Sequence, residues 1–274
     1  SKITKDLSSS FPEFKIKDKN KKITNSLPKN IWMYWHEGVE KLPDLQKSCY
    51  ERIKILNPNW KLNLLSLDDS LNLFPEFDIL STTLTPQSYS DLLRITLLKK
   101  YGGVWCDATL LMTESLDFFL EKNLSLSGFT SLQRSGYTTI QKNKNDYEPY
   151  TFFIVSEKNC PIIDYLYKGM NIFLKKFETP ANYFWLNILF SKFANNSENF
   201  RNSWLYSDFY DGLKGHLALR MIRANKFDLA VNHLSQYPFH KLKSSLKFEK
   251  VWPLINYDGI LDNVAPVAQL DRAP

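Results

Sequence analysis

The sequence SDLLRITLLKKYGGVWCD occupies residues 90–107 and predicts a buried helix followed directly by a buried strand. Thr85 can cap the helix, Pro86 fits its first turn, and apolar side chains recur at the spacing of one packed helical face. The glycine pair at 102–103 ends the helix and allows the backbone to pass closely before the short apolar strand. Asp107 then stands at the carboxyl end of that strand, where open α/β sheets bind their ligands.

Three charged side chains of this stretch are candidates for a functional site. Asp91 and Arg94 lie three residues apart, so they share one side of the predicted helix. An i, i+3 pair on a surface usually adds only about a few tenths of a kcal/mol and carries no function. The glycine pair and Asp107 favour the functional interpretation, because carboxylates and an arginine gathered in a cleft are typical of active sites.

Strand and helix patterns alternate on the amino-terminal side of this stretch. Residues 31–35 predict a core strand, residues 43–56 a helix that ends before Pro58, and residues 60–67 a second strand. Asp68 and Asp69 follow that strand in an ordinary helix-capping sequence, so we leave them out of the site. This alternation predicts an α/β fold with a mainly parallel sheet flanked by helices.

The pattern is weaker beyond residue 107. We expect helices at 113–122, 160–177, 183–193 and 212–225, strands at 125–130 and 151–155, and a polar loop at about 133–149. The apolar run at 183–190 is interpreted either as a buried helix or as an interfacial patch that reaches a lipid-linked substrate.

Composition limits the function without selecting one. The 274 residues carry a formal charge of +6, with a sequence pI near 9.0, which suits phosphate-bearing ligands, nucleic acid or an anionic membrane surface. We find no signature of a nucleic-acid-binding fold and no apolar segment long enough to span a bilayer. Cys49, Cys106 and Cys160 are far apart and lack metal-ligand spacing, so a reducing cytoplasm is the simpler expectation.

The elements Ser-Asp-Leu-Leu-Arg, Tyr-Gly-Gly-Val-Trp and Asp-Ala-Thr resemble the capsular polysaccharide synthesis glycosyltransferases, relatives of DXD-containing sugar transferases with a GT-A fold. The resemblance implies that Asp91 and Arg94 hold the donor sugar or its ribose. It also implies that Asp107 binds a divalent metal, Mn²⁺ or Mg²⁺, on the nucleotide diphosphate. The second aspartate of the usual DXD motif is Thr109 here, and a hydroxyl is a weaker ligand for a hard cation than a carboxylate.

The same resemblance implies roles for three further residues. Trp35, at the end of the first strand, would stack on the uracil ring, although a lone tryptophan is also commonly a core residue. His240 would complete the metal site, unless it is a surface histidine in a basic turn, and Lys241 would contact the diphosphate. His36, His216 and His233 have no comparable setting.

The expected domain organisation is a lysine-rich arm at 1–27, a GT-A-like domain at 28–262 and an unstructured tail at 263–274. Residues 28–135 would form the nucleotide-sugar half of the domain, and residues 136–262 the acceptor half.

The resemblance implies transfer of a hexose from a UDP-sugar to a lipid-linked capsular polysaccharide intermediate, with retention of configuration by analogy. Expected partners are the UDP-sugar, a polysaccharide or lipid-linked oligosaccharide acceptor and the membrane surface, with no nucleic acid. The expected location is the cytoplasm, at the inner face of the membrane. The alternative is a non-catalytic nucleotide-sugar or glycan-binding protein with the same fold.

Overall fold

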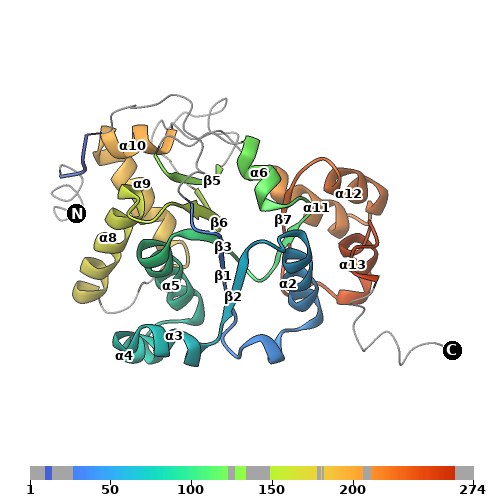
Figure 1. Cartoon of the computed structure of the whole chain (residues 1–274), viewed down its shortest axis with the longest axis horizontal. Coiled ribbons are helices and arrows are strands. Elements are labelled where there is room, and N and C mark those ends of the chain that lie inside the picture. The colour runs from blue at the N-terminus through green and yellow to red at the C-terminus, as the bar shows by residue number, and fades with distance from the viewer. Residues whose placement is uncertain are drawn as a thin grey trace.

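The structure, a computed structural model, describes residues 10–13, 27–122, 127–133, 149–177, 180, 182–205 and 211–262. A five-stranded sheet with the order β2-β1-β3-β6-β5 forms its centre, and helices lie on both faces of this sheet (Figure 1). The strands are β1 (Asn30–Tyr34), β2 (Lys61–Leu65), β3 (Gly103–Cys106), β5 (Phe129–Gln133) and β6 (Pro149–Ser156), and a separate two-stranded sheet consists of β4 (Leu110–Met112) and β7 (Phe239–Lys241).

Four of the five central strands run in the same direction. Both β2 and β3 pair with β1 in parallel. Strand β6 is antiparallel to β3, and β5 is antiparallel to β6, so β5 points the same way as the first three. The predicted class, α/β with a mainly parallel sheet flanked by helices, is therefore confirmed, whereas the antiparallel β6 and the β4–β7 pair are not predicted by the sequence patterns.

Two groups of helices cover the sheet (Figure 1). On one side lie α3 (Leu67–Leu73), α4 (Asp78–Thr83), α5 (Pro86–Tyr101), α8 (Pro161–Phe177), α9 (Trp185–Asn196) and α10 (Glu198–Leu205). On the other lie α2 (Asp44–Leu56), α6 (Leu116–Lys122), α11 (Lys214–Arg223), α12 (Phe227–Leu234) and α13 (Phe248–Ile255). Two 3₁₀ turns, Val39–Lys41 and Pro75–Phe77, complete the regular structure of the described residues.

Side chains of the central strands alternate between two apolar clusters. Trp32 and Trp105 pack with α5, α8 and α9, whereas Ile31 and Val104 pack against α6 and β7 on the opposite face. This period of two is what a sheet buried on both faces requires.

The helix–strand unit at 86–106 forms as its local signals predict. The Thr85 hydroxyl accepts a hydrogen bond from the Ser88 backbone N–H at 3.2 Å, and Pro86 occupies the first helical position. Gly102 ends α5 at a φ of 67°. At Gly103, where φ is 104°, any Cβ would collide with the carbonyl oxygen of Asn30, so glycine lets β3 lie directly beside β1.

Most predicted elements are confirmed within a few residues of their expected bounds, but the expected strand at 125–130 begins only at Phe129. The helix-capping interpretation of Asp69 is confirmed in part: the N-cap of α3 is Ser66, and Asp69, at the third helical position, completes a capping box with it.

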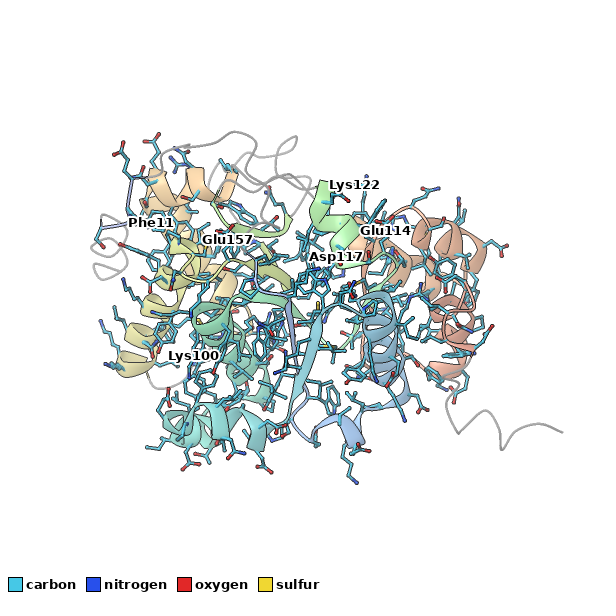
Figure 2. The ribbon with its side chains drawn as sticks, in the orientation of Figure 1. Phe11, Lys100, Glu114, Asp117, Lys122 and Glu157 are labelled. Carbon is cyan, nitrogen blue, oxygen red and sulfur yellow. The ribbon has the colours of Figure 1, made fainter. Side chains whose placement is uncertain are left out.

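Only parts of the predicted arm are described, and residues 134–148 of the polar loop and the tail at 263–274 lie outside the described residues. Within the arm, Phe11, which Figure 2 labels, is buried. Its ring packs against Tyr165 of α8 and Phe200 of α10, at centroid distances of 4.7 and 5.1 Å. Among the described helices, none combines the length and the apolar character that crossing a membrane requires.

Candidate active site

Asp107 is the first residue after β3 and the centre of a charged cluster. Its backbone N–H donates to the Phe152 carbonyl at 2.9 Å, which fixes the turn beside β6. The Trp105 indole N–H donates to Oδ1 of Asp107 at 2.9 Å, and Nη2 of Arg94 lies 3.5 Å from the same oxygen. The other oxygen, Oδ2, accepts a hydrogen bond from Nζ of Lys241 at 2.6 Å.

Arg94 connects three elements through one guanidinium group. Its Nη2 lies 3.1 Å from Oδ1 of Asp91, one helical turn earlier on α5. Its Nη1 donates to the Thr151 carbonyl of β6 at 2.6 Å, and its Cζ lies 4.9 Å from the centre of the Trp105 ring. The side chain is only 2% exposed, so these contacts hold its charge in one orientation.

The two carboxylates of the cluster have pKa values on opposite sides of their ordinary value. Burial raises the pKa of Asp91 to about 6, although the Arg94 guanidinium opposes this shift. Burial acts in the same direction on Asp107. There, however, the charges of Lys241 and Arg94, with hydrogen bonds from Lys241 and Trp105, hold the pKa at about 2. Environments that separate the pKa values of neighbouring carboxylates are characteristic of catalytic sites.

Lys241 reaches this cluster from a distant part of the sequence. The antiparallel pairing of β7 with β4 places Lys241 opposite Leu110, just after the Asp107–Thr109 turn. Its ammonium group also donates to Oγ1 of Thr109 at 2.7 Å. The structure therefore brings together Asp91, Arg94, Asp107 and Lys241, which we call the charged cluster.

The charged cluster separates two adjoining pockets. The first, of about 550 Å³, lies where β1, β3 and β7 end and is lined by Trp35, Arg94, Asp107, Lys241 and Lys243 among others. The second, of about 460 Å³, lies between β6, α9 and α11 and contains Asp91, His216 and Arg220 in its lining. Arg94, Asp107, Lys241, Gln87 and Tyr183 line both pockets. Both volumes are in the range of about 300–1,000 Å³ typical of small-ligand sites.

Trp35 lies in the wall of the first pocket, as the prediction of a stacking residue requires. It follows β1 directly and is partly exposed rather than fully buried. Its indole N–H is shielded from solvent and has no acceptor within the described part of the chain. A buried donor without a partner is unusual in a native protein, and a bound ligand is one way to satisfy it.

His240 does not join the charged cluster, contrary to the expectation that it binds a metal with Asp107. Neighbouring residues of a strand point to opposite faces, so His240 points away when Lys241 faces Asp107. The histidine is fully buried, and its ring packs against His233 and Tyr237 at centroid distances of 5.3 and 5.8 Å. Burial lowers its pKa to about 3. The alternative of a surface histidine is also wrong, because the side chain of His240 is fully buried.

The donor set at Asp107 does not fit the expected divalent metal. Across the residues that the structure describes, no group of three histidine, cysteine, aspartate or glutamate side chains is arranged to hold an ion. Both carboxylate oxygens of Asp107 already accept hydrogen bonds or ion pairs, and Thr109 accepts one from the same ammonium group. Mg²⁺ and Mn²⁺ prefer free carboxylate oxygens, which this turn does not offer.

Several residues that line the two pockets were not predicted from the sequence. Gln87 lies four residues before Asp91, so helical spacing alone could have placed it on the same face of α5. His36 lines the first pocket and His216 the second, although neither has a distinctive sequence setting. Burial, followed by the charges of Lys241 and Arg220, lowers the pKa of His216 to about 4, so its ring is neutral at pH 7.

The family model for capsular polysaccharide synthesis proteins matches residues 1–257, and the chain belongs to this family. The chain is 33% identical over 111 residues to Glycosyltransferase afumC of Aspergillus fumigatus, a match that covers 35% of this chain and 28% of afumC. It is 25% identical over 175 residues to O-glycosyltransferase braB of Annulohypoxylon truncatum, covering 56% of this chain and 39% of braB. The matched regions thus span well under half the length of either relative.

A comparison with solved structures finds the PaToxG glycosyltransferase, which aligns over 96% of this chain and 92% of its own. The TM-score is 0.41, and the sequence identity is 14%.

Proposed function

We propose that this protein is a glycosyltransferase that moves a hexose from a UDP-sugar to a hydroxyl group of a lipid-linked capsular polysaccharide intermediate. The observation that carries this proposal is the charged cluster, because three of its members, Arg94, Asp107 and Lys241, line both pockets and the fourth, Asp91, lines the second. A transferase needs such an arrangement, because the donor and the acceptor must meet at one reacting carbon. The family and the two relatives named as glycosyltransferases support the same reaction class.

The first pocket suits the nucleotide part of the donor. Trp35 offers a flat apolar ring for the uracil base. Among the residues that the structure describes, the lining of this pocket contains three cations, Arg94, Lys241 and Lys243, against the two carboxylates of Glu37 and Asp107. This excess of positive charge favours a diphosphate over a neutral ligand.

The second pocket suits a glycan acceptor. Tyr150 and Phe152 of β6 supply aromatic rings, against which the apolar C–H face of a sugar can stack. His216 and Arg220 of α11 supply polar groups for its hydroxyls. Phe184 lies at the same pocket and is 61% exposed, which suits contact with the lipid part of the acceptor or with a membrane surface at the inner face of the cell membrane.

The chemistry assigns a task to each member of the charged cluster. Asp91 and Arg94 orient the sugar hydroxyls, so that the anomeric carbon faces the acceptor oxygen. Asp107 fixes Arg94 and Lys241 in place, and these cations offset the charge that develops on the departing phosphate. Retention of configuration is proposed by analogy with related DXD transferases.

The test is a screen of UDP- and GDP-sugars for nucleotide release and glycan product, with wild type compared with Asp107→Ala. We expect turnover with a UDP-hexose and a loss of about a hundredfold or more in the variant, because the cluster loses its central anion. Asp228→Ala, an equivalent change at an exposed position on α12, should retain wild-type turnover. Nucleotide binding without any turnover would instead identify a non-catalytic binding protein.

A further inference from the structure

The ammonium group of Lys241 occupies the position between the two side chains of the DXD-like turn. It lies 2.6 Å from Oδ2 of Asp107 and 2.7 Å from Oγ1 of Thr109, the first and third residues of Asp-Ala-Thr. A cation bridging those side chains would have to sit where this nitrogen sits. The turn is therefore already bridged by a positive charge that belongs to the chain.

The sequence change at Thr109 matches this arrangement. An aspartate there would give the turn two carboxylates, which suit a divalent cation. A threonine leaves one carboxylate and one neutral hydroxyl, and this set balances a single positive charge. Asp107 pairs with Lys241 in this way, with side chains only 23% and 22% exposed, while the charge of the neighbouring Arg94 is balanced by Asp91 at 3.1 Å.

Lys241 retains the capacity to bind a phosphate. An ammonium group has three N–H bonds. Two of them serve Asp107 and Thr109, its hydrogen-bond acceptors in the part of the chain that the structure describes. The third remains for a ligand, and Lys241 lines both pockets at the point where the donor and the acceptor would meet.

We propose that Lys241, held by Asp107 and Thr109, supplies the cation for the leaving diphosphate, so that sugar transfer proceeds without a divalent metal. This inference rests on the proposed function.

The reaction places a specific demand on that cation. The bond between the anomeric carbon and the phosphate oxygen breaks, and its electron pair stays on the phosphate. A new bond forms from the acceptor oxygen to the anomeric carbon, and the acceptor proton is released to water. One negative charge thus develops on the diphosphate, and a fixed ammonium group beside it lowers the barrier.

The first experiment measures UDP binding by isothermal titration, in excess EDTA and then in Mn²⁺. We expect the same dissociation constant in both, within a factor of about two, because the chain supplies the cation. Transfer from the UDP-sugar should likewise persist in EDTA. Nucleotide binding or sugar transfer that requires Mn²⁺ would overturn the inference, while leaving the glycosyltransferase proposal intact.

The second experiment changes the cation itself. Lys241→Met should weaken UDP binding in EDTA by about tenfold or more, which corresponds to about 1.4 kcal/mol, and should lower kcat. Lys241→Arg should recover part of both, because it keeps the charge but not the compact ammonium group. Lys250→Met removes the same charge from an exposed position on α13 and should bind UDP like wild type.

The outcomes separate the two proposals. Binding and transfer that Lys241→Met leaves unchanged would overturn the role of Lys241, even if no metal is required. Failure of every nucleotide to bind, with or without metal, would overturn the proposed function as well. Circular dichroism of each variant establishes that the compared proteins are folded.

Discussion

Asp91 and Asp107 show how one side-chain type acquires two electrostatic characters within one cluster. Asp91 is almost fully buried, and this burial raises its pKa to about 6 although the Arg94 guanidinium beside it opposes the shift. Asp107 has two cationic partners, and its pKa falls to about 2 despite its burial. At pH 7 both carboxylates are ionised, but only Asp91 gains a proton under mildly acidic conditions.

This difference predicts the pH dependence of activity. Protonation of Asp91 below about pH 6 removes its charge from Arg94, so kcat/KM should fall by about tenfold per pH unit. The pKa values of His216 and Asp107 are lower, about 4 and about 2, so these two groups cannot produce the fall in kcat/KM near pH 6. The measurement is kcat/KM as a function of pH, over about three pH units from about pH 5 to about pH 8, for wild type and for Asp91→Asn.

The Asp91→Asn variant should be poorly active at every pH and should lack the acidic limb. A limb that persists in this variant would assign the titration to another group. Unfolding caused by protonation of Asp91 cannot explain the loss of activity at acidic pH. Its pKa is raised in the folded state, so its contribution to stability is greatest below about pH 4 and is lost as the pH rises through about 6.

The turn before α9 carries Tyr183, which lines both pockets, and Phe184, which lines the second. The Asn182 side-chain oxygen accepts a hydrogen bond from the Phe184 N–H at 2.8 Å, which fixes this turn. Helix α9 then buries Trp185 and Leu186, whereas Tyr183 remains 62% exposed. The structure thus combines the two interpretations of the apolar run, a buried helix and an exposed aromatic patch at its start.

Tyr183 lines both pockets, so we expect its loss to weaken substrate binding without unfolding the protein. Tyr183→Ala should raise the KM for the donor and for the acceptor by about threefold to tenfold, because it removes an aromatic wall worth about 0.5–1.5 kcal/mol. The unfolding free energy should change by less than about 0.5 kcal/mol at this exposed position. Tyr183→Phe keeps the ring and should retain the wild-type KM values. Ile79→Ala, at a 75% exposed position on α4, should leave both KM values unchanged, and an equal rise there would contradict a specific role.

The elements that could be predicted from the sequence are those with local signals. Helix α5 begins and ends where the cap at Thr85 and the glycine at 102 require, and this accuracy places Asp91 and Arg94 on one face. Strands β4 and β7 have three residues each, too few to show a period, so their pairing could not be predicted. The assignment of His240 failed for a related reason, since a single residue of register decides which face of a strand a side chain occupies.

The third apolar cluster of the molecule supports the site from the side of the carboxyl-terminal helices. It joins Cys49 of α2 and Leu111 of β4 to buried side chains of α11, α12 and α13. Because β7 pairs with β4, packing in this cluster also holds in place the strand that ends in Lys241. The charged cluster therefore depends on packing between segments that lie more than a hundred residues apart.

Arg52 joins β4 to the carboxyl-terminal helices through hydrogen bonds, and its removal should destabilise the whole domain. The fully buried guanidinium donates to the Met112 carbonyl of β4 at 2.6 Å, to the Ile255 carbonyl of α13 at 3.1 Å and to both oxygens of Asp258. Arg52→Met leaves these acceptors without their donor, so urea unfolding should show a loss of about 3 kcal/mol or more. Asp258→Asn should add little to this loss in the double variant, since both changes break the same contact. Lys54→Met, on the exposed side of the same helix, should cost less than about 0.5 kcal/mol. Equal stabilities of the Arg52 and Lys54 variants would mean that apolar packing alone holds β4 to the carboxyl-terminal helices.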